Sequence, residues 1–316
     1  MKKVFEKTRF WVSAIAIAGV FSLSACTEDN DDGPGMQDPT IAARVTGDAN
    51  FSILAAAVTR AGLADALNQP GTLTVFAPDN AAFNAAGITL AMVNSMAPAD
   101  LAAILTYHVL GAKVESGGVP VSDAVVTLNG KKIFASRNAN GVFVNGVKVK
   151  SADLAASNGV IHVIENVLIP PTQTIAEIAS GIDNFSILVA AVVRAGLLDA
   201  VSGEGKYTVF APTNAAFQAA GFADAAAINA APVADVLAIV SQHVIATNVY
   251  ASDLINNATA PTIKAGTTLT ISTAPAGVKV TGSANPFSNV VTTTAGATFN
   301  ITATNGVIHV VDRVIL

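Results

Sequence analysis

Apolar residues recur at a helical period in the segment that follows Asn50. They occupy positions 53, 54, 57, 58 and 61, which share one face of a helix, and Asn50 or Ser52 can cap its start. A short apolar run, residues 73–77, predicts a strand that ends before a proline. Pro98 stands at the start of a second predicted helix, over residues 99–105. This part of the chain therefore predicts helices around a short strand.

The period changes to two after His108, which is typical of strands. Asn129-Gly130 and Asn145-Gly146 supply the turns of two predicted hairpins. From Gly159 to Ile169 the chain is almost continuously apolar, which suits a buried strand. The other predicted strands are residues 125–128, 133–135, 142–144 and 147–149. Helices followed by strands within one unit predict an α+β fold class.

The whole unit is present twice. Residues 50–67 and 184–201 are identical at 14 of 18 positions, and residues 74–87 and 208–221 at 12 of 14. An offset of 134 residues (184 − 50) indicates tandem globular domains and not a solenoid. We expect a first domain at 40–170 and a second at 171–316, joined at Pro170-Pro171. The second copy is longer, mainly through a Thr-rich stretch at 281–299.

The N-terminal segment has the composition of a cleaved leader. Basic residues precede an apolar run, residues 10–23, that is too short for an ordinary membrane span. The run ends in Leu-Ser-Ala-Cys, which resembles a bacterial lipobox. We predict a lipoprotein signal peptide at 1–25 and lipid attachment at Cys26. An ordinary signal peptide with a chance cysteine is the alternative.

An acidic spacer follows the cysteine. Residues 26–39 include four acids in six positions and then Gly and Pro, which predicts a flexible tether. The spacer also resembles the export signal of surface lipoproteins in Bacteroidetes-type bacteria, and this implies an outer-membrane lipoprotein exposed at the cell surface. A periplasm-facing protein is the alternative. Removing 1–25 changes the net charge from −5 to 13 − 21 = −8, so nucleic acid is not an expected partner.

Three sequence blocks in each unit resemble those of a known family. TVFAPDNAAF and NGVIHVIENVLIP, with Tyr107-His108 between them, resemble the signature blocks of the fasciclin domain. The second unit supplies TVFAPTNAAF, Gln242-His243 and NGVIHVVDRVIL. The resemblance covers about residues 40–316. It implies two tandem domains, each a helical layer packed on a β-wedge or β-sandwich, and a role in adhesion or extracellular binding. It implies no shared chemistry.

The histidines fall in pairs, one pair per unit. A metal or acid/base site is one interpretation. Zinc needs three or four ligands, however, and no carboxylate stands at a clear ligand spacing, so we expect no metal site. The other interpretation is histidines that bond to the backbone and tie the blocks together. We assign a structural role to four signature residues: Asn80, His162, Asn214 and His309.

Binding residues are expected near the Tyr-His element. Tyr107 combines an apolar ring with a polar tip, as interface anchors often do, although a core tyrosine is the alternative. The candidate binding residues are Tyr107, His108 and His243. Gln242 replaces the tyrosine in the second unit, so a role that depends on the tyrosine is not expected there.

Composition and motifs favour binding over catalysis. The single cysteine excludes internal disulfides and multi-cysteine metal or redox sites. There is no Gly-x-Ser-x-Gly motif and no phosphate-binding glycine loop. Asp79 and Thr213 occupy equivalent positions, which a catalytic carboxylate would not tolerate. We expect no enzyme activity and no cofactor.

The predicted function is a cell-surface adhesion or interaction module, anchored by an N-terminal lipid. It would bind an extracellular protein or polysaccharide, and two linked copies would gain avidity on a repetitive surface. The only tryptophan, Trp11, lies in the leader, so a strong single glycan pocket is not favoured. The alternative is a ligand-capture or accessory lipoprotein of an outer-membrane nutrient uptake system.

Overall fold

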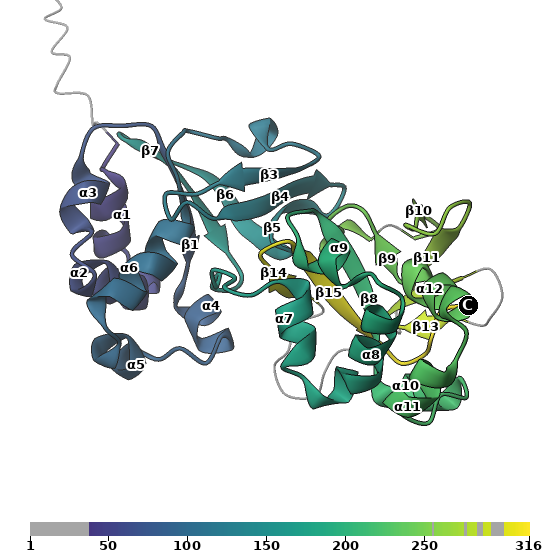
Figure 1. Cartoon of the computed structure of the whole chain (residues 1–316). Coiled ribbons are helices and arrows are strands. Elements are labelled where there is room, and N and C mark those ends of the chain that lie inside the picture. The colour runs from purple at the N-terminus through teal and green to yellow at the C-terminus, as the bar shows by residue number, and fades with distance from the viewer. Residues whose placement is uncertain (1–37, 255, 275–276, 283–286, 292–299) are drawn as a thin grey trace, which may run out of the picture. The chain divides into compact units, whose positions relative to one another are not determined.

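The computed structural model describes residues 38–254, 256–274, 277–282, 287–291 and 300–316. Asp38–Leu316 forms one compact unit (Figure 1). The predicted signal peptide, Cys26 and the tether up to residue 37 lie outside the described residues, as does most of the Thr-rich stretch. Within the described part of the chain, no helix has the length and apolar character needed to cross a bilayer.

The first repeat, residues 40–170, begins with a helical layer. Its helices are α1 (Ile41–Gly47), α2 (Ser52–Arg60), α3 (Ala64–Asn68), α4 (Asn80–Ala85), α5 (Leu90–Ser95) and α6 (Pro98–Tyr107). Polar side chains start several of them, because Thr40, Asp79 and Thr89 each accept a first-turn N–H. The buried face of α2 carries the residues that the period predicts: Ile53, Leu54, Ala57 and Val58.

The strands of the first repeat form one mixed sheet. They are β1 (Leu73–Pro78), β2 (Val109–Leu110), β3 (Ser122–Val126), β4 (Lys132–Asn138), β5 (Gly141–Val144), β6 (Val147–Ala156) and β7 (Gly159–Ile164). Their order is β2-β1-β7-β6-β5-β4-β3. β1 and β7 are parallel, with Phe76 opposite His162, so the two signature blocks lie side by side. The predicted hairpin turns join β3 to β4 and β5 to β6, and Gly130 and Gly146 both have positive φ.

The second repeat, residues 171–316, repeats this order. Its helices are α7 (Ile175–Ser180), α8 (Ser186–Arg194), α9 (Leu198–Ser202), α10 (Asn214–Ala219), α11 (Ala225–Ala230) and α12 (Val233–Gln242). Its described strands are β8 (Tyr207–Pro212), β9 (Val244–Ile245), β10 (Thr259–Pro261), β11 (Thr268–Ala274), β12 (Gly277–Thr281), β13 (Ser288–Asn289), β14 (Ile301–Ala303) and β15 (Gly306–Val311). They form two sheets, β10-β11-β12-β13 and β14-β15-β8-β9.

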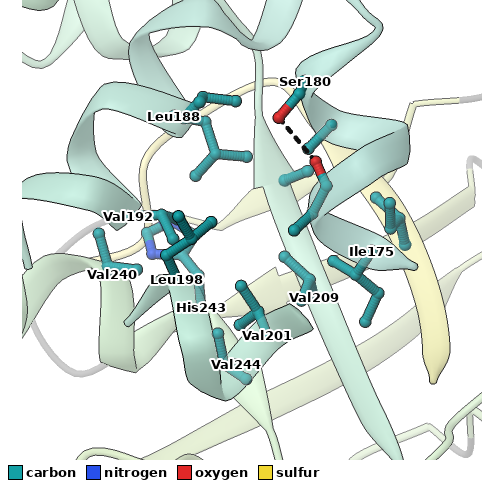
Figure 2. A pocket seen from close by; sticks show the side chains of 15 residues that line it. Ile175, Ser180, Leu188, Val192, Leu198, Val201, Val209, Val240, His243 and Val244 are labelled. Carbon is teal, nitrogen blue, oxygen red and sulfur yellow. Dashed lines mark hydrogen bonds between the residues drawn. The ribbon is translucent and has the colours of Figure 1, made fainter. Parts of the chain in front are cut away.

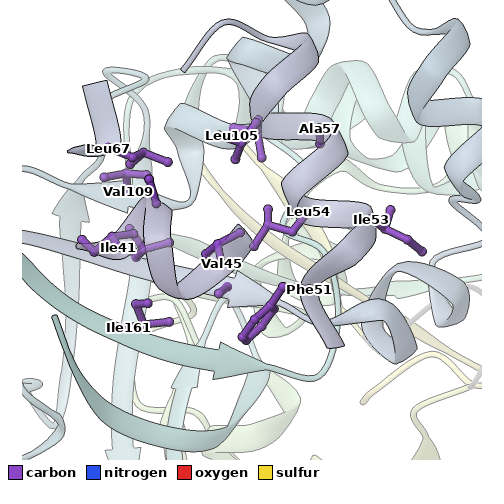
Figure 3. Packing of buried hydrophobic residues seen from close by; sticks show 14 of the residues in the cluster. Ile41, Val45, Phe51, Ile53, Leu54, Ala57, Leu67, Leu105, Val109 and Ile161 are labelled. Carbon is purple, nitrogen blue, oxygen red and sulfur yellow. The ribbon is translucent and has the colours of Figure 1, made fainter. Parts of the chain in front are cut away.

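Apolar side chains fill both faces of the central strands. In the first repeat, residues of α1, α2 and α6 pack against Ile161 of β7 (Figure 3). Side chains alternate along a strand, so Phe76 and Ile164 point to the other face and pack with Ile133 and Val144. Equivalent clusters form in the second repeat. The predicted α+β class, with a helical layer on a sheet in each of two tandem domains, is confirmed.

One local prediction is wrong. Neither Asn50 nor Ser52 caps α2 through its side chain. The Asn80 side chain instead accepts the N–H of Ile53 at 3.0 Å, from the block that follows β1. Because this cap comes from a residue 27 positions away in the chain, the sequence around the start of α2 does not reveal it.

Candidate functional site

His162 and His309 connect the central strands to neighbouring loops. Nε2 of His162 lies 2.8 Å from the carbonyl oxygen of Val114, and its ring lies 5.5 Å from that of Phe76. His309 reaches the carbonyl of Val249 in the same way, at 2.7 Å. Each is almost fully buried. Each of these contacts ties a central strand to a neighbouring loop, and the structural role of the two histidines stays a prediction.

His108 and His243 end the helices α6 and α12. Nδ1 of His108 lies 2.8 Å from the Ile104 carbonyl oxygen, and Nε2 accepts the N–H of Leu168 at 2.9 Å. His243 makes both bonds in the second repeat. Because Nε2 accepts, Nδ1 carries the proton of the neutral ring. Burial lowers the pKa of each histidine to about 4, against the smaller opposing effect of the carbonyl bond.

Tyr107 is fully buried beneath the β5–β6 hairpin. Its hydroxyl donates to the carbonyl of Lys132 at 3.0 Å and accepts from the amide of Asn145 at 2.8 Å. Burial raises the pKa of Tyr107 to about 12. Like His108 and His243, it offers almost no surface to solvent. Their role as binding residues stays a prediction, and the geometry gives them bonds within the fold instead.

Asn80 and Asn214 join each first block to the helix before it. The Asn80 amide donates to the carbonyl of Ala49 while its oxygen caps α2. Asn214 accepts the N–H of Ile187 at 3.0 Å, at the start of α8. Both amides therefore have a structural role that depends on their side-chain oxygens.

The two repeats meet around Tyr250, which is buried. Its ring lies 5.6 Å from that of Phe134 on β4. Nearby, the hydroxyl of Ser136 donates to the carboxylate of Asp253. Burial raises the pKa of Asp253, although the hydrogen bonds from Ser136 and the Tyr250 backbone act against it. An aromatic pair and a hydrogen-bonded carboxylate thus connect the repeats.

A groove of about 1200 Å³ is lined by residues of both repeats. It follows the Pro170-Pro171 junction, the β5–β6 hairpin and part of the second repeat. Lys148 and Glu165 line it and are exposed. The remaining wall combines amides, hydroxyls, backbone and apolar side chains, including Asn145, Thr172, Gln173, Ser252, Ile301 and Thr302. Such a wall offers both hydrogen bonds and apolar contact.

Sequence reasoning did not predict this groove or the Tyr250 contact. Both depend on how one repeat packs on the other, which no periodicity within a repeat encodes. The short Pro170-Pro171 junction was the one relevant signal, because a short stiff connection keeps two domains close. Among the described residues, no cluster of three or more His, Cys, Asp or Glu side chains is arranged to hold a metal ion.

Comparison with known proteins decides the family. The family model described as "Fasciclin domain" matches residues 49–170 and 183–316, more than half of the chain. This chain belongs to the fasciclin domain family. Both matches begin after the first helix of the repeat, α1 or α7. Ile41 and Ile175 from these helices nevertheless pack into the domain cores, so the folded unit of each repeat begins before the matched residues.

Its relatives include animal and bacterial proteins. Transforming growth factor-beta-induced protein ig-h3 of Sus scrofa is 42% identical over 129 residues, which are 40% of this chain and 19% of that protein. This fasciclin chain therefore spans about a fifth of the length of ig-h3. Protein sll1483 of Synechocystis sp. is 42% identical over 134 residues, 42% of this chain and 74% of that protein.

A solved FAS1 domain pair from the insect cell adhesion molecule fasciclin I is also similar to the chain. It is 18% identical, with a TM-score of 0.41, and the match covers 87% of this chain and 95% of that one.

Proposed function

We propose that this fasciclin protein is an extracellular adhesion or interaction module that binds a protein or polysaccharide chain, and that it is not an enzyme. The observation that supports this most is the groove of about 1200 Å³ shared by the two repeats. It is much larger than a single sugar ring or side chain requires, and it is lined by both polar and apolar groups. These properties suit a segment of an extended polymer.

Charge in the groove adds a way to recognise such a segment. Lys148 and Glu165 are exposed, so both are accessible to charged or hydrogen-bonding groups of a ligand. Together they orient the bound segment and contribute part of its affinity. The rest of the affinity would come from the apolar and amide wall around Ile301 and Gln173.

Beads coated with residues 38–316 test the proposal. They are mixed with panels of matrix proteins and cell-wall polysaccharides, and bound material is measured. We expect at least one class to bind, and binding to fall at least about tenfold in the double variant K148A/E165A. Lys132→Ala is the matched control, because Lys132 is exposed and does not line the groove. Failure of every ligand to bind, or equal binding by the groove variant, would refute the proposal.

A lipid anchor at Cys26 and display on the outer membrane are part of this proposal. They are supported by the leader, the lipobox-like sequence and the acidic spacer. Labelling of growing cells with a fatty acid should mark the wild-type chain and not Cys26→Ser. Protease added to intact cells should remove a surface-exposed protein. Survival of the protein on intact cells would instead support a periplasm-facing location.

Capture of a soluble ligand is the second candidate function, for an accessory lipoprotein of a nutrient uptake system. The same groove favours it, since its volume also accommodates a short oligosaccharide or peptide. Calorimetry with soluble fragments separates the two ideas. Saturable binding of one fragment per chain, without bead clumping, supports capture. Clumping that needs immobilised polymer supports adhesion.

A further inference from the structure

Each repeat encloses an apolar cavity between its helices and its central strands. The cavity of the first repeat is about 150 Å³, and that of the second, drawn in Figure 2, is about 30 Å³. Equivalent residues line the two, namely Leu54, Val75 and His108 in the first and Leu188, Val209 and His243 in the second. The position of the cavity therefore belongs to the fold, whereas its volume depends on the individual side chains.

The polar side chains in the wall of the first cavity are already bonded. Both ring nitrogens of His108 have backbone partners, at 2.8 and 2.9 Å. The hydroxyl of Thr106 donates to the carbonyl of Ala102 at 2.6 Å. Water in a cavity needs two to four polar partners, which this wall does not supply. The chemistry therefore favours an uncharged ligand without hydrogen-bonding groups.

Two positions near the cavities differ in size between the repeats. Leu198 and Val189 line the second cavity, whereas the equivalent residues of the first repeat, Ala64 and Ala55, pack against the core without lining the first cavity. Larger side chains at these two positions would reach the first cavity as leucine and valine reach the second.

The first cavity also has an edge near solvent. Leu128 lines it and is 54% exposed. Its N–H donates to the carbonyl of Val109 at 2.8 Å, which holds the β3–β4 turn against the end of α6. In the second repeat Ile263 makes the equivalent bond to Val244, but its side chain packs against the core. A ligand can therefore enter the first cavity beside Leu128.

We propose that the first repeat contains a binding site for one small, uncharged apolar molecule of about the size of an aromatic ring. The volume of the first cavity suits a ligand of this size, because an apolar cavity of about 150 Å³ in another protein binds benzene. The equivalent cavity of the second repeat, at about 30 Å³, is too small for such a molecule. This site is separate from the groove and does not depend on the adhesive function.

Titration of the purified chain with benzene, followed by calorimetry and by the shift in thermal midpoint, tests the site. We expect one benzene per chain and a rise in thermal midpoint with benzene concentration. Ala64→Leu should weaken binding at least about tenfold, and Leu198→Ala should leave the first site intact. Phenol should bind more weakly than benzene, because the wall leaves its hydroxyl without a partner.

Circular dichroism establishes that the variants are folded. If Ala64→Leu does not fold, Ala55→Val provides the same test, since the second repeat already carries valine there. No binding by the wild type up to benzene saturation would overturn the site. Unchanged benzene binding by a folded variant whose first cavity is filled would mean that benzene binds elsewhere, and would overturn the location of the site.

Discussion

The buried imidazoles of His108 and His243 make the fold sensitive to acid. Their pKa values fall from 6.5 to about 4 on folding, mainly through burial. The unfolded chain therefore binds more protons between these values, so the stability contribution is complete above pH 6.5 and is lost as the pH falls through about 4. Each histidine should contribute about 3 kcal/mol across this window.

Urea unfolding measured from pH 7 to pH 4 checks this prediction. His108→Asn should reduce the slope of the unfolding free energy against pH, because one of the two titrating groups is removed. An unfolding free energy that stays constant down to pH 4.5 would contradict the assignment of two neutral, buried histidines.

The cap provided by Asn80 gives a second prediction at the residue scale. Asn80→Ala removes the acceptor for the Ile53 N–H and the donor to the Ala49 carbonyl. We expect a loss of about 1–2 kcal/mol, measured by denaturant unfolding. Asn50→Ala is the control, since the Asn50 side chain donates to exposed Asp48 and the loss of this bond should cost much less. Equal losses in the two variants would mean that Asn80 is not the cap.

At the scale of elements, a close approach between parallel strands explains the glycine that begins β7. A Cβ atom at Gly159 would lie 2.0 Å from the carbonyl oxygen of Leu73 on β1. Gly159→Ala must therefore separate β1 from β7, and we expect a loss of about 2–4 kcal/mol. Thermal unfolding measures it. Gly71→Ala, where a Cβ would meet no atom within 4 Å, should change little, and a tolerated Gly159→Ala would contradict the observed strand pairing.

Much of the element structure follows from the sequence. Period and turn residues located α2, α6 and both hairpins of the first repeat, because those signals act over a few residues. The parallel pairing of β1 with β7 was not predicted, since the two strands are far apart in the chain. The sequence left both a core and an interface position open for Tyr107, because a tyrosine with a polar tip suits either one.

For the whole molecule, Asp253 links the packing of the repeats to pH. Burial raises its pKa, so its contribution to stability is greatest below its ordinary value of 3.8 and decreases as the pH rises through the folded value. Asp253→Asn keeps an acceptor for Ser136 without the buried charge. We expect it to raise the thermal midpoint at pH 7, whereas Ser136→Ala should lower it. A lower midpoint for Asp253→Asn would contradict the prediction.

The tandem organisation was predictable from the sequence, because 14 of 18 residues recur in one block of each repeat. The groove was not, because its walls come from the junction and from both repeats together. A candidate site that depends on the packing of two domains has no local signature in either one. The binding residues predicted from the sequence, Tyr107, His108 and His243, are buried in the domain cores. The groove that we propose as the ligand-binding surface lies elsewhere.

Adhesion of cells that display the full chain tests the central claim most directly. Cells carrying the wild type, K148A/E165A or Lys132→Ala are matched for the amount of displayed protein, and their attachment to the polymer that binds wild-type beads is counted. We predict attachment for the wild type and Lys132→Ala, and a loss of at least about tenfold for the groove variant. Equal attachment by all three would contradict a binding role for the groove between the repeats.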